Sequence, residues 1–300
     1  MSRRLSPPVR QRRRYFPPIL LLTAALAVVI VLAAVLLSLR PKPAQQPPEQ
    51  DPHEGQVYIN DGANMVWHTP MDGVPVSEVE QDEFRREGER VLYTGSNYYT
   101  RWGVDVSNYQ GDIDWDDLYR QGIRFAYLRL GYRGYTEGVL QRDRAFERYY
   151  EGAKDAGIDV GVYFFSQAVT VREAAEEALY ALELLDGREL ELPVYFDWEP
   201  TFADDSRTAE YDCRYLTESA AAFCNVVEKG GYTAGVYLNR QHGYYRYDLR
   251  ALSGRSLWVA DYADYPDFYY AYDVWQYSDS GELDGVDEVV DLNLEFTPVA

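Results

Sequence analysis

The segment Pro193–Pro200, read as P-V-Y-F-D-W-E-P, carries two carboxylic acids spaced two residues apart. The apolar residues before them favour a β-strand. Alternate side chains of a strand point to the same face, so Asp197 and Glu199 project side by side, roughly 7 Å apart along the backbone. Neighbouring buried acids raise each other's pKa, as a general acid working near neutral pH requires. Alone, a D-x-E pair more often caps a helix or binds an arginine, so the rest of the chain has to support the catalytic interpretation.

The charge distribution divides the chain into an N-terminal basic tail and an acidic remainder. The net charge is −20, six arginines lie within residues 1–18, and Glu49 is the first acidic residue. The acidic part repels nucleic acid and anionic lipid, so nucleic-acid binding is not expected.

Residues 19–39 are uncharged and, at 1.5 Å per residue, span about 30 Å as a helix. Arginines before this run and acids after it predict a single-pass helix in the cell membrane, with residues 1–18 in the cytoplasm and the rest outside, facing the cell wall. A cleaved signal peptide is the alternative, but its apolar core is normally shorter.

Two segments separate this helix from the regular part of the chain. Residues 40–55 are rich in proline and glutamine and predict an extended linker. Residues 56–100 contain two short strand patterns around an acidic stretch, Glu78–Glu89, with helical potential. We expect a small β-containing extension that braces the main domain; a separate module or a surface for a protein partner is the alternative.

Cys213 and Cys224 fall in one predicted helix, Tyr211–Lys229. Eleven residues of helix hold them about 16 Å apart, too far for a disulfide, so two buried thiols are expected. The three histidines are scattered, and their spacing suggests neither a zinc site nor a histidine-based triad. Clustered carboxylates could bind magnesium or calcium, but we favour a site with no metal and no cofactor.

From residue 101 to 300, strand patterns alternate with helical ones, which indicates an α/β barrel. The last three strand patterns are joined by segments of about a dozen residues without helical periodicity. The expected architecture is a TIM-like (β/α)5β3 barrel of five βα units and three nearly bare strands.

In such barrels the reactive groups lie at the carboxyl ends of the strands. The predicted strand ends supply five acids: Asp105, Asp197, Glu199, Asp261 and Asp291. Aromatic residues accompany them, and acids with flat aromatic walls suit the cleavage of carbohydrates. For any one aromatic residue, packing in the core is an equally good explanation.

Six ordered motifs carry a more specific signal. The chain resembles the family-25 glycoside hydrolases, the bacterial and phage muramidases or lysozymes, in segments D-V-S-N-Y-Q-G (105–111), I-D-W (113–115), A-G-I-D-V-G-V-Y (156–163), P-V-Y-F-D-W-E (193–199), W-Q-Y-S (275–278) and V-D-L-N (290–293). It departs from the usual family pattern at Tyr109, Phe164, Phe165 and Asp261, which affects the expected sugar contacts more than the carboxylates.

The resemblance implies a peptidoglycan hydrolase that cleaves the β-1,4 bond between N-acetylmuramic acid and N-acetylglucosamine. It implies that Glu199 is the general acid/base, that Asp197 orients the acetamido group, which attacks the anomeric carbon with retention, and that Asp105 and Asp291 complete the acidic ring. The expected substrate-binding residues are Gln110, Tyr132, Tyr163, Phe165, Trp258, Asp261 and Trp275.

Two other functions remain open at this point. One is an N-acetylhexosaminidase of chitinase-like specificity, and the other is a non-catalytic wall-binding or scaffold protein. Keeping four mutually repelling acids argues against the second, because binding alone does not need them. Biological role, muropeptide preference and oligomeric state are not predicted.

Overall fold

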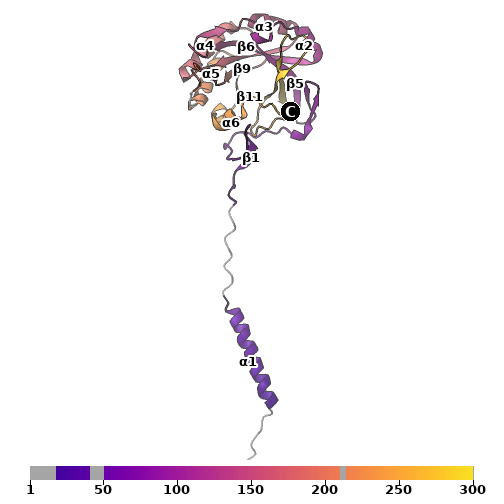
Figure 1. Cartoon of the computed structure of the whole chain (residues 1–300), viewed down its shortest axis with the longest axis vertical. Helices are drawn as coiled ribbons and strands as arrows, with labels where there is room; N and C mark the ends of the chain where they lie inside the picture. Colours follow the sequence, from indigo (N-terminus) through magenta and orange to yellow (C-terminus); the bar gives the residue numbers. More distant parts are fainter. Residues whose placement is uncertain (1–17, 41–50, 210–213, 300) are drawn as a thin grey trace, which may run out of the picture. The chain divides into compact units, whose positions relative to one another are not determined.

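The computed structural model describes residues 18–40, 51–209 and 214–299. The chain divides into two compact units, residues 1–54 and 55–300, and Figure 1 shows the elements of both. The described residues of the first unit form one helix, α1 (Pro18–Ser38). Among the residues that the structure describes, no helix is long and apolar enough to cross a membrane.

Eight strands of the second unit close into a barrel, which confirms the predicted eight-strand α/β fold. Seven of them run parallel from β5 to β12, and β13 closes the ring by pairing antiparallel with both β12 and β5. The strands are β5 (Tyr98–Val106), β6 (Ile123–Arg133), β8 (Asp159–Ser166), β9 (Val194–Trp198), β10 (Ala234–Asn239), β11 (Ser256–Ala260), β12 (Val274–Gly281) and β13 (Val290–Pro298). A short strand, β7 (Leu140–Arg142), extends the sheet beside the end of β6.

Helices follow the first five barrel strands and lie outside the ring (Figure 1). They are α2 (Trp115–Gln121), α3 (Phe146–Asp155), α4 (Val171–Leu185), α5 (Leu216–Lys229) and α6 (Arg240–Tyr245), with a 3-10 turn, η3 (Leu249–Leu252), after the last. Between β11, β12 and β13 the described chain forms no helix, as the short connections predicted.

The extension consists of two β-hairpins. β1 (Val57–Asn60) pairs with β2 (Met65–His68), and β3 (Phe84–Glu87) pairs with β4 (Arg90–Tyr93). The prediction that Glu78–Glu89 could be helical is wrong beyond one 3-10 turn, η1 (Gln81–Glu83). Arg85 pairs with Leu92 and Arg86 with Val91, so hairpin pairing overrides the weak helical propensity of this acidic stretch.

The extension braces the barrel on the side that lacks helices. The Phe84 ring packs 5.4 Å from the Trp275 ring on the outer face of β12. The hydroxyl of Tyr277, on the same strand, donates to the Glu89 carbonyl at 3.0 Å, and Val91 is buried. The extension thus replaces the missing outer helices, which agrees with the expected bracing role.

Aromatic rings fill the inside of the barrel below its carboxyl end. This group, which we call the floor, comprises Phe125, Tyr127, Tyr195 and Trp258. The Tyr127 and Trp258 ring centroids are 4.8 Å apart, and Tyr195 lies 5.2 Å from Trp258. Glycines on neighbouring strands make room: a Cβ on Gly161 would lie 2.4 Å from the Tyr127 ring.

Cys224 is a buried free thiol in α5, packed as a small apolar residue as predicted. The other cysteine of the predicted helix, Cys213, lies outside the described residues. The helix itself begins at Leu216 in the structure.

Candidate active site

A cavity of about 260 Å³ opens at the carboxyl end of the parallel strands, above the floor. It contains the four acids that the sequence motifs single out as catalytic, together with polar and aromatic side chains. Its lining comprises Asp105, Ser107, Tyr109, Gln110, Arg129, Tyr163, Phe165, Asp197, Glu199, Tyr237, Trp258, Tyr262, Gln276 and Asp291.

Strand geometry explains how distant acids meet here. Asp105 is near the end of β5, Asp197 is in β9, and Glu199 follows β9 directly. Asp291 was expected at the end of its strand but is the second residue of β13. Because β13 runs antiparallel, its beginning lies at the same edge as the other strand ends, and Asp291 is the register partner of Asp105.

Asp105 and Asp291 form a pair held by two amides. Asp105 Oδ2 accepts from Gln276 Nε2 and from Asn293 Nδ2, both at 2.8 Å, and Gln276 Nε2 also lies 3.3 Å from Asp291 Oδ2. Burial raises the pKa of Asp105 to about 6. Burial and the neighbouring Asp105 charge raise the pKa of Asp291 further, so Asp291 keeps its proton while Asp105 is ionised.

Asp197 and Glu199 form the second pair. Burial first, and then the Glu199 charge, raises the pKa of Asp197 well above its ordinary value. Asp197 is 5% exposed, and its Oδ1 has no hydrogen-bond partner among the described residues. Burial, followed by the Asp105 charge, raises the pKa of Glu199 to about 7. Glu199 can therefore hold a proton at neutral pH and release it during a reaction.

A buried hydrogen-bond chain fixes the backbone that carries Glu199. Gln167 Nε2 donates to the Glu199 carbonyl at 2.6 Å, and the Thr208 hydroxyl donates to Gln167 Oε1 at 2.8 Å. Gln167 and Thr208 are both buried. This support holds the Glu199 backbone without lining the cavity, and no sequence motif identified it.

Several predicted substrate-binding residues line the cavity: Gln110, Tyr163, Phe165 and Trp258. Tyr262 and Tyr237 also line it, and their hydroxyls donate to Gln276 Oε1 at 2.9 and 2.8 Å. Gln276 and Asn293 belong to motifs that carry the family resemblance. Only the structure shows that both side chains point into the barrel and contact Asp105. Arg129 was missed because a lone arginine in a strand gives no specific signal.

Three residues expected to contact the substrate do not line this cavity. Trp275 points outward from β12, because Val274 and Gln276 take the inward positions, and its Nε1 donates to the Asp261 carbonyl at 2.7 Å. Asp261 instead lies 3.2 Å from Arg240 Nη2 and accepts from the Asp267 N–H, which shapes the loop after β11. Tyr132 lines a neighbouring cleft, where its hydroxyl donates to Gln141.

No group of three or more metal-ligating side chains suited to an ion occurs in the described part of the chain. None of the residues 56–100 lines the acidic cavity, so the extension does not cover it.

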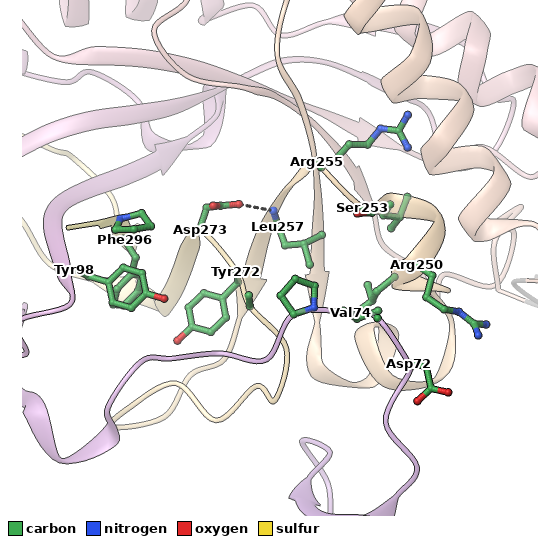
Figure 2. Close-up of a pocket in the computed structure, with 17 residues that line it drawn as sticks. Asp72, Val74, Tyr98, Arg250, Ser253, Arg255, Leu257, Tyr272, Asp273 and Phe296 are labelled. Carbon is green, nitrogen blue, oxygen red and sulfur yellow. Dashed lines mark hydrogen bonds between the residues drawn. The ribbon is translucent and has the colours of Figure 1, made fainter. Parts of the chain in front are cut away.

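A different cavity, of about 400 Å³, lies at the opposite end of the barrel, between residues 72–75 and the start of β11 (Figure 2). Tyr98, Leu257, Tyr272 and Phe296 give it a largely apolar wall. Of its two acids, Asp72 and Asp273, the second accepts from the Leu257 N–H at 3.1 Å and from the Ser256 hydroxyl at 2.8 Å. With that carboxylate already satisfied, this cavity lacks the paired acids of the first one.

Comparisons with known proteins agree with the site. Residues 104–286, more than half of the chain, match the family described as Glycosyl hydrolases family 25. Lysozyme M1 of Streptomyces globisporus is 26% identical over 269 residues, covering 84% of this chain and 81% of that protein. The autolytic lysozyme of Clostridium acetobutylicum is 25% identical over 197 residues; the match covers 65% of this chain but only 55% of that relative.

Solved structures share the fold. The modular autolysin LytC from Streptococcus pneumoniae superposes with a TM-score of 0.60 at 22% identity, over 75% of this chain and 52% of that one. A family 25 glycosyl hydrolase from Bacillus anthracis gives a TM-score of 0.54 at 23% identity, over 68% of this chain and 91% of that one.

Proposed function

Because the chain belongs to glycosyl hydrolase family 25, we propose that it is a peptidoglycan hydrolase that cleaves the β-1,4 bond between N-acetylmuramic acid and N-acetylglucosamine. The observation that carries this proposal is the paired acids at the cavity. Glu199, with its pKa raised to about 7, stands beside a second acid whose Oδ1 is free of hydrogen bonds within the described residues.

In the proposed reaction, Glu199 donates its proton to the glycosidic oxygen as the bond to the anomeric carbon breaks. The carbonyl oxygen of the 2-acetamido group attacks that carbon, and Asp197 accepts a hydrogen bond from the acetamido N–H. Glu199, now ionised, removes a proton from the water that opens this intermediate, so the configuration is retained and Glu199 regains its proton. Asp105 and Asp291 hold sugar hydroxyls, and the Asp105 charge adds to burial in keeping the pKa of Glu199 high.

The test is digestion of purified peptidoglycan by the full-length protein, beside the Glu199→Gln variant. Mass spectrometry of the reduced products should show muramic-acid reducing ends with the parent protein and at least 1,000-fold slower release with the variant, because the proton donor is gone. Glu183→Gln, an exposed site on α4, is the matched control and should match the parent.

Other outcomes identify other functions. Glucosamine reducing ends, or a preference for chitin oligosaccharides, would indicate a chitinase-like hexosaminidase. Sugar binding without release by any of the three proteins would indicate a non-catalytic wall-binding protein.

We also propose that residues 19–39 tether the enzyme to the cell membrane, with the barrel on the outer side. The uncharged run, with six arginines before it and acids after it, supports this arrangement. A tether would concentrate the enzyme near its polymer without separate wall-binding repeats. The full chain should then stay with membranes through an alkaline carbonate wash, and release by that wash would contradict the tether.

A further inference from the structure

A cleft of about 660 Å³ adjoins the acidic cavity and has the opposite charge. Four arginines line it: Arg129, Arg133, Arg142 and Arg144. Among the described residues, no aspartate or glutamate joins that lining. Tyr109, Arg129 and Phe165 line both spaces, so the two lie side by side. The chain as a whole has a net charge of −20, so a cleft lined by arginines stands out. Such a cleft suits an anionic ligand.

The strand register sets the length of this path. Asp197 is the register partner of Phe165, Phe165 of Tyr132, and Tyr132 of Gln141, across β9, β8, β6 and β7. Three strand spacings of about 4.8 Å place the Gln141 backbone roughly 14 Å from that of Asp197. Arg142 and Arg144 follow Gln141 directly. The near end of the cleft therefore lies about the length of one sugar ring from the acids, and its far end lies beside β7.

The four arginines differ in how much charge they can offer a ligand. Arg133 is buried and donates to Glu177 at 2.7 Å, and Arg129 donates to Asp143 at 2.8 Å and to Asn108 at 2.7 Å. Arg142 is 41% exposed and pairs with Glu147. Arg144 is exposed and has no ion pair within the described part of the chain. The charge of Arg144 is thus available to an anion.

Aromatic side chains stiffen the junction between the two spaces. The Arg129 guanidinium lies 5.1 Å from the Tyr109 ring centroid and 5.2 Å from that of Tyr132. Held by its acid partner and by two rings, Arg129 forms a fixed wall. Tyr135 adds a further ring to the cleft lining.

We propose that this arginine-lined cleft binds the carboxylates of the peptide stem carried by muramic acid, with Arg144 and Arg142 as the recognising cations. The inference rests on the proposed muramidase function. The ionised Asp105 in the cavity repels an anionic appendage at short range, whereas the sugar rings themselves carry no charge. A peptide with free carboxylates is therefore directed sideways, where guanidinium groups can bind each carboxylate through two hydrogen bonds. The cleft would make stem-bearing strands better substrates than bare glycan.

The experiment measures kcat and KM of the full-length protein on two forms of one substrate. Soluble glycan strands are freed of phosphate polymers with hydrofluoric acid, and half of them are then stripped of stems with an amidase, which leaves only the short lactyl carboxylate on each muramic acid. Arg144→Gln should raise KM three- to tenfold on stem-bearing strands, leaving kcat unchanged. On stripped strands it should match the parent. Added salt should raise the parent's KM on stem-bearing strands and have less effect on the variant.

Arg120→Gln is the matched control, because Arg120 is exposed at the end of α2 and pairs only with the neighbouring Asp117 among the described residues. It should behave as the parent on both substrates. Equal KM changes for Arg144→Gln on both substrates, or none on either, would overturn the stem-binding cleft. If the parent cleaves neither substrate, the muramidase proposal fails instead, and the inference fails with it.

Discussion

The two ends of the barrel interior are built for opposite purposes. The floor buries closely spaced aromatic rings; the Tyr195 hydroxyl bonds to Ser256 at 2.7 Å, and the uncharged Tyr127 hydroxyl lacks a partner in the described structure. The mouth, by which we mean the four acids of the cavity, buries groups that repel one another, and one oxygen of Asp197 is left without a partner in the described structure. Stability is concentrated at the floor, while the mouth keeps groups that weaken the fold but can transfer protons.

The largest expected effect on stability is at the floor. Phe125 is fully buried inside the barrel, so Phe125→Ala should lower the free energy of unfolding by about 3–5 kcal/mol through lost burial and a cavity. Urea unfolding measures this change. Tyr99→Ala, at a 68% exposed position of the same barrel, should change stability by less than about 0.5 kcal/mol. Equal losses would mean that the floor does not carry the stability.

A smaller loss is expected from overfilling the floor. In Gly161→Ala the new Cβ would meet the Tyr127 ring at 2.4 Å and the Leu192 Cβ at 2.8 Å, so the packed rings must shift. We expect a loss of about 1–3 kcal/mol by thermal or urea unfolding. Gly134→Ala, where the nearest atom is 3.6 Å away, provides the comparison and should be nearly neutral.

At the mouth, removing an acid should stabilise the protein. The pKa of Asp197 is raised in the folded state, so its contribution to stability is present at low pH and is lost as pH rises through that folded pKa. Asp197→Asn avoids this loss, so it should raise the free energy of unfolding by about 1–2 kcal/mol at pH 8 and by little at pH 4. The hydrolytic activity of the variant should fall at least 100-fold. A lower free energy of unfolding for the variant at pH 8 would contradict the claim that the acids of the mouth weaken the fold.

The smallest predicted effect is the pH response of the intact enzyme. A general acid must be protonated, and the pKa of Glu199 is raised to about 7. The value of kcat/KM should therefore fall above pH 7, by about tenfold per unit. The check is a pH series on soluble glycan strands, with circular dichroism confirming that the fold persists. A profile flat to pH 9 would contradict Glu199 as the acid.

The sequence allowed the strand-borne acids to be predicted because local signals coincide there. Residues Val194–Phe196 favour a strand, and two-residue alternation places Asp197 and Glu199 together. Asp105 and Asp291 were chosen correctly for the cavity, but the reason given for Asp291 was incomplete. Nothing local shows that β13 runs antiparallel, and only that direction brings its beginning to the mouth.

Side-chain direction in the late strands was harder to predict. Trp275 was assigned to the substrate, yet Gln276 is the residue that faces inward. Polar–apolar alternation fails as a guide because both faces of β12 are buried, one inside the barrel and one beneath the Phe84 hairpin. The burial of the outer face could not be predicted, because the short strands of the extension that cover it show little periodicity in the sequence. Arg144 was missed since a surface arginine acquires meaning only from the cleft around it.

The pairing of β5 with β13 has a consequence for how the protein folds. Asp105 and Asp291 face each other across this seam, although 186 residues separate them in the chain. Contacts of such high sequence separation require closure of a long loop, which makes their formation slow. Half of the acidic ring therefore comes together only when the last strand docks. In refolding, hydrolytic activity should return after the fluorescence of the tryptophans, so that the catalytic centre reports completion of the barrel.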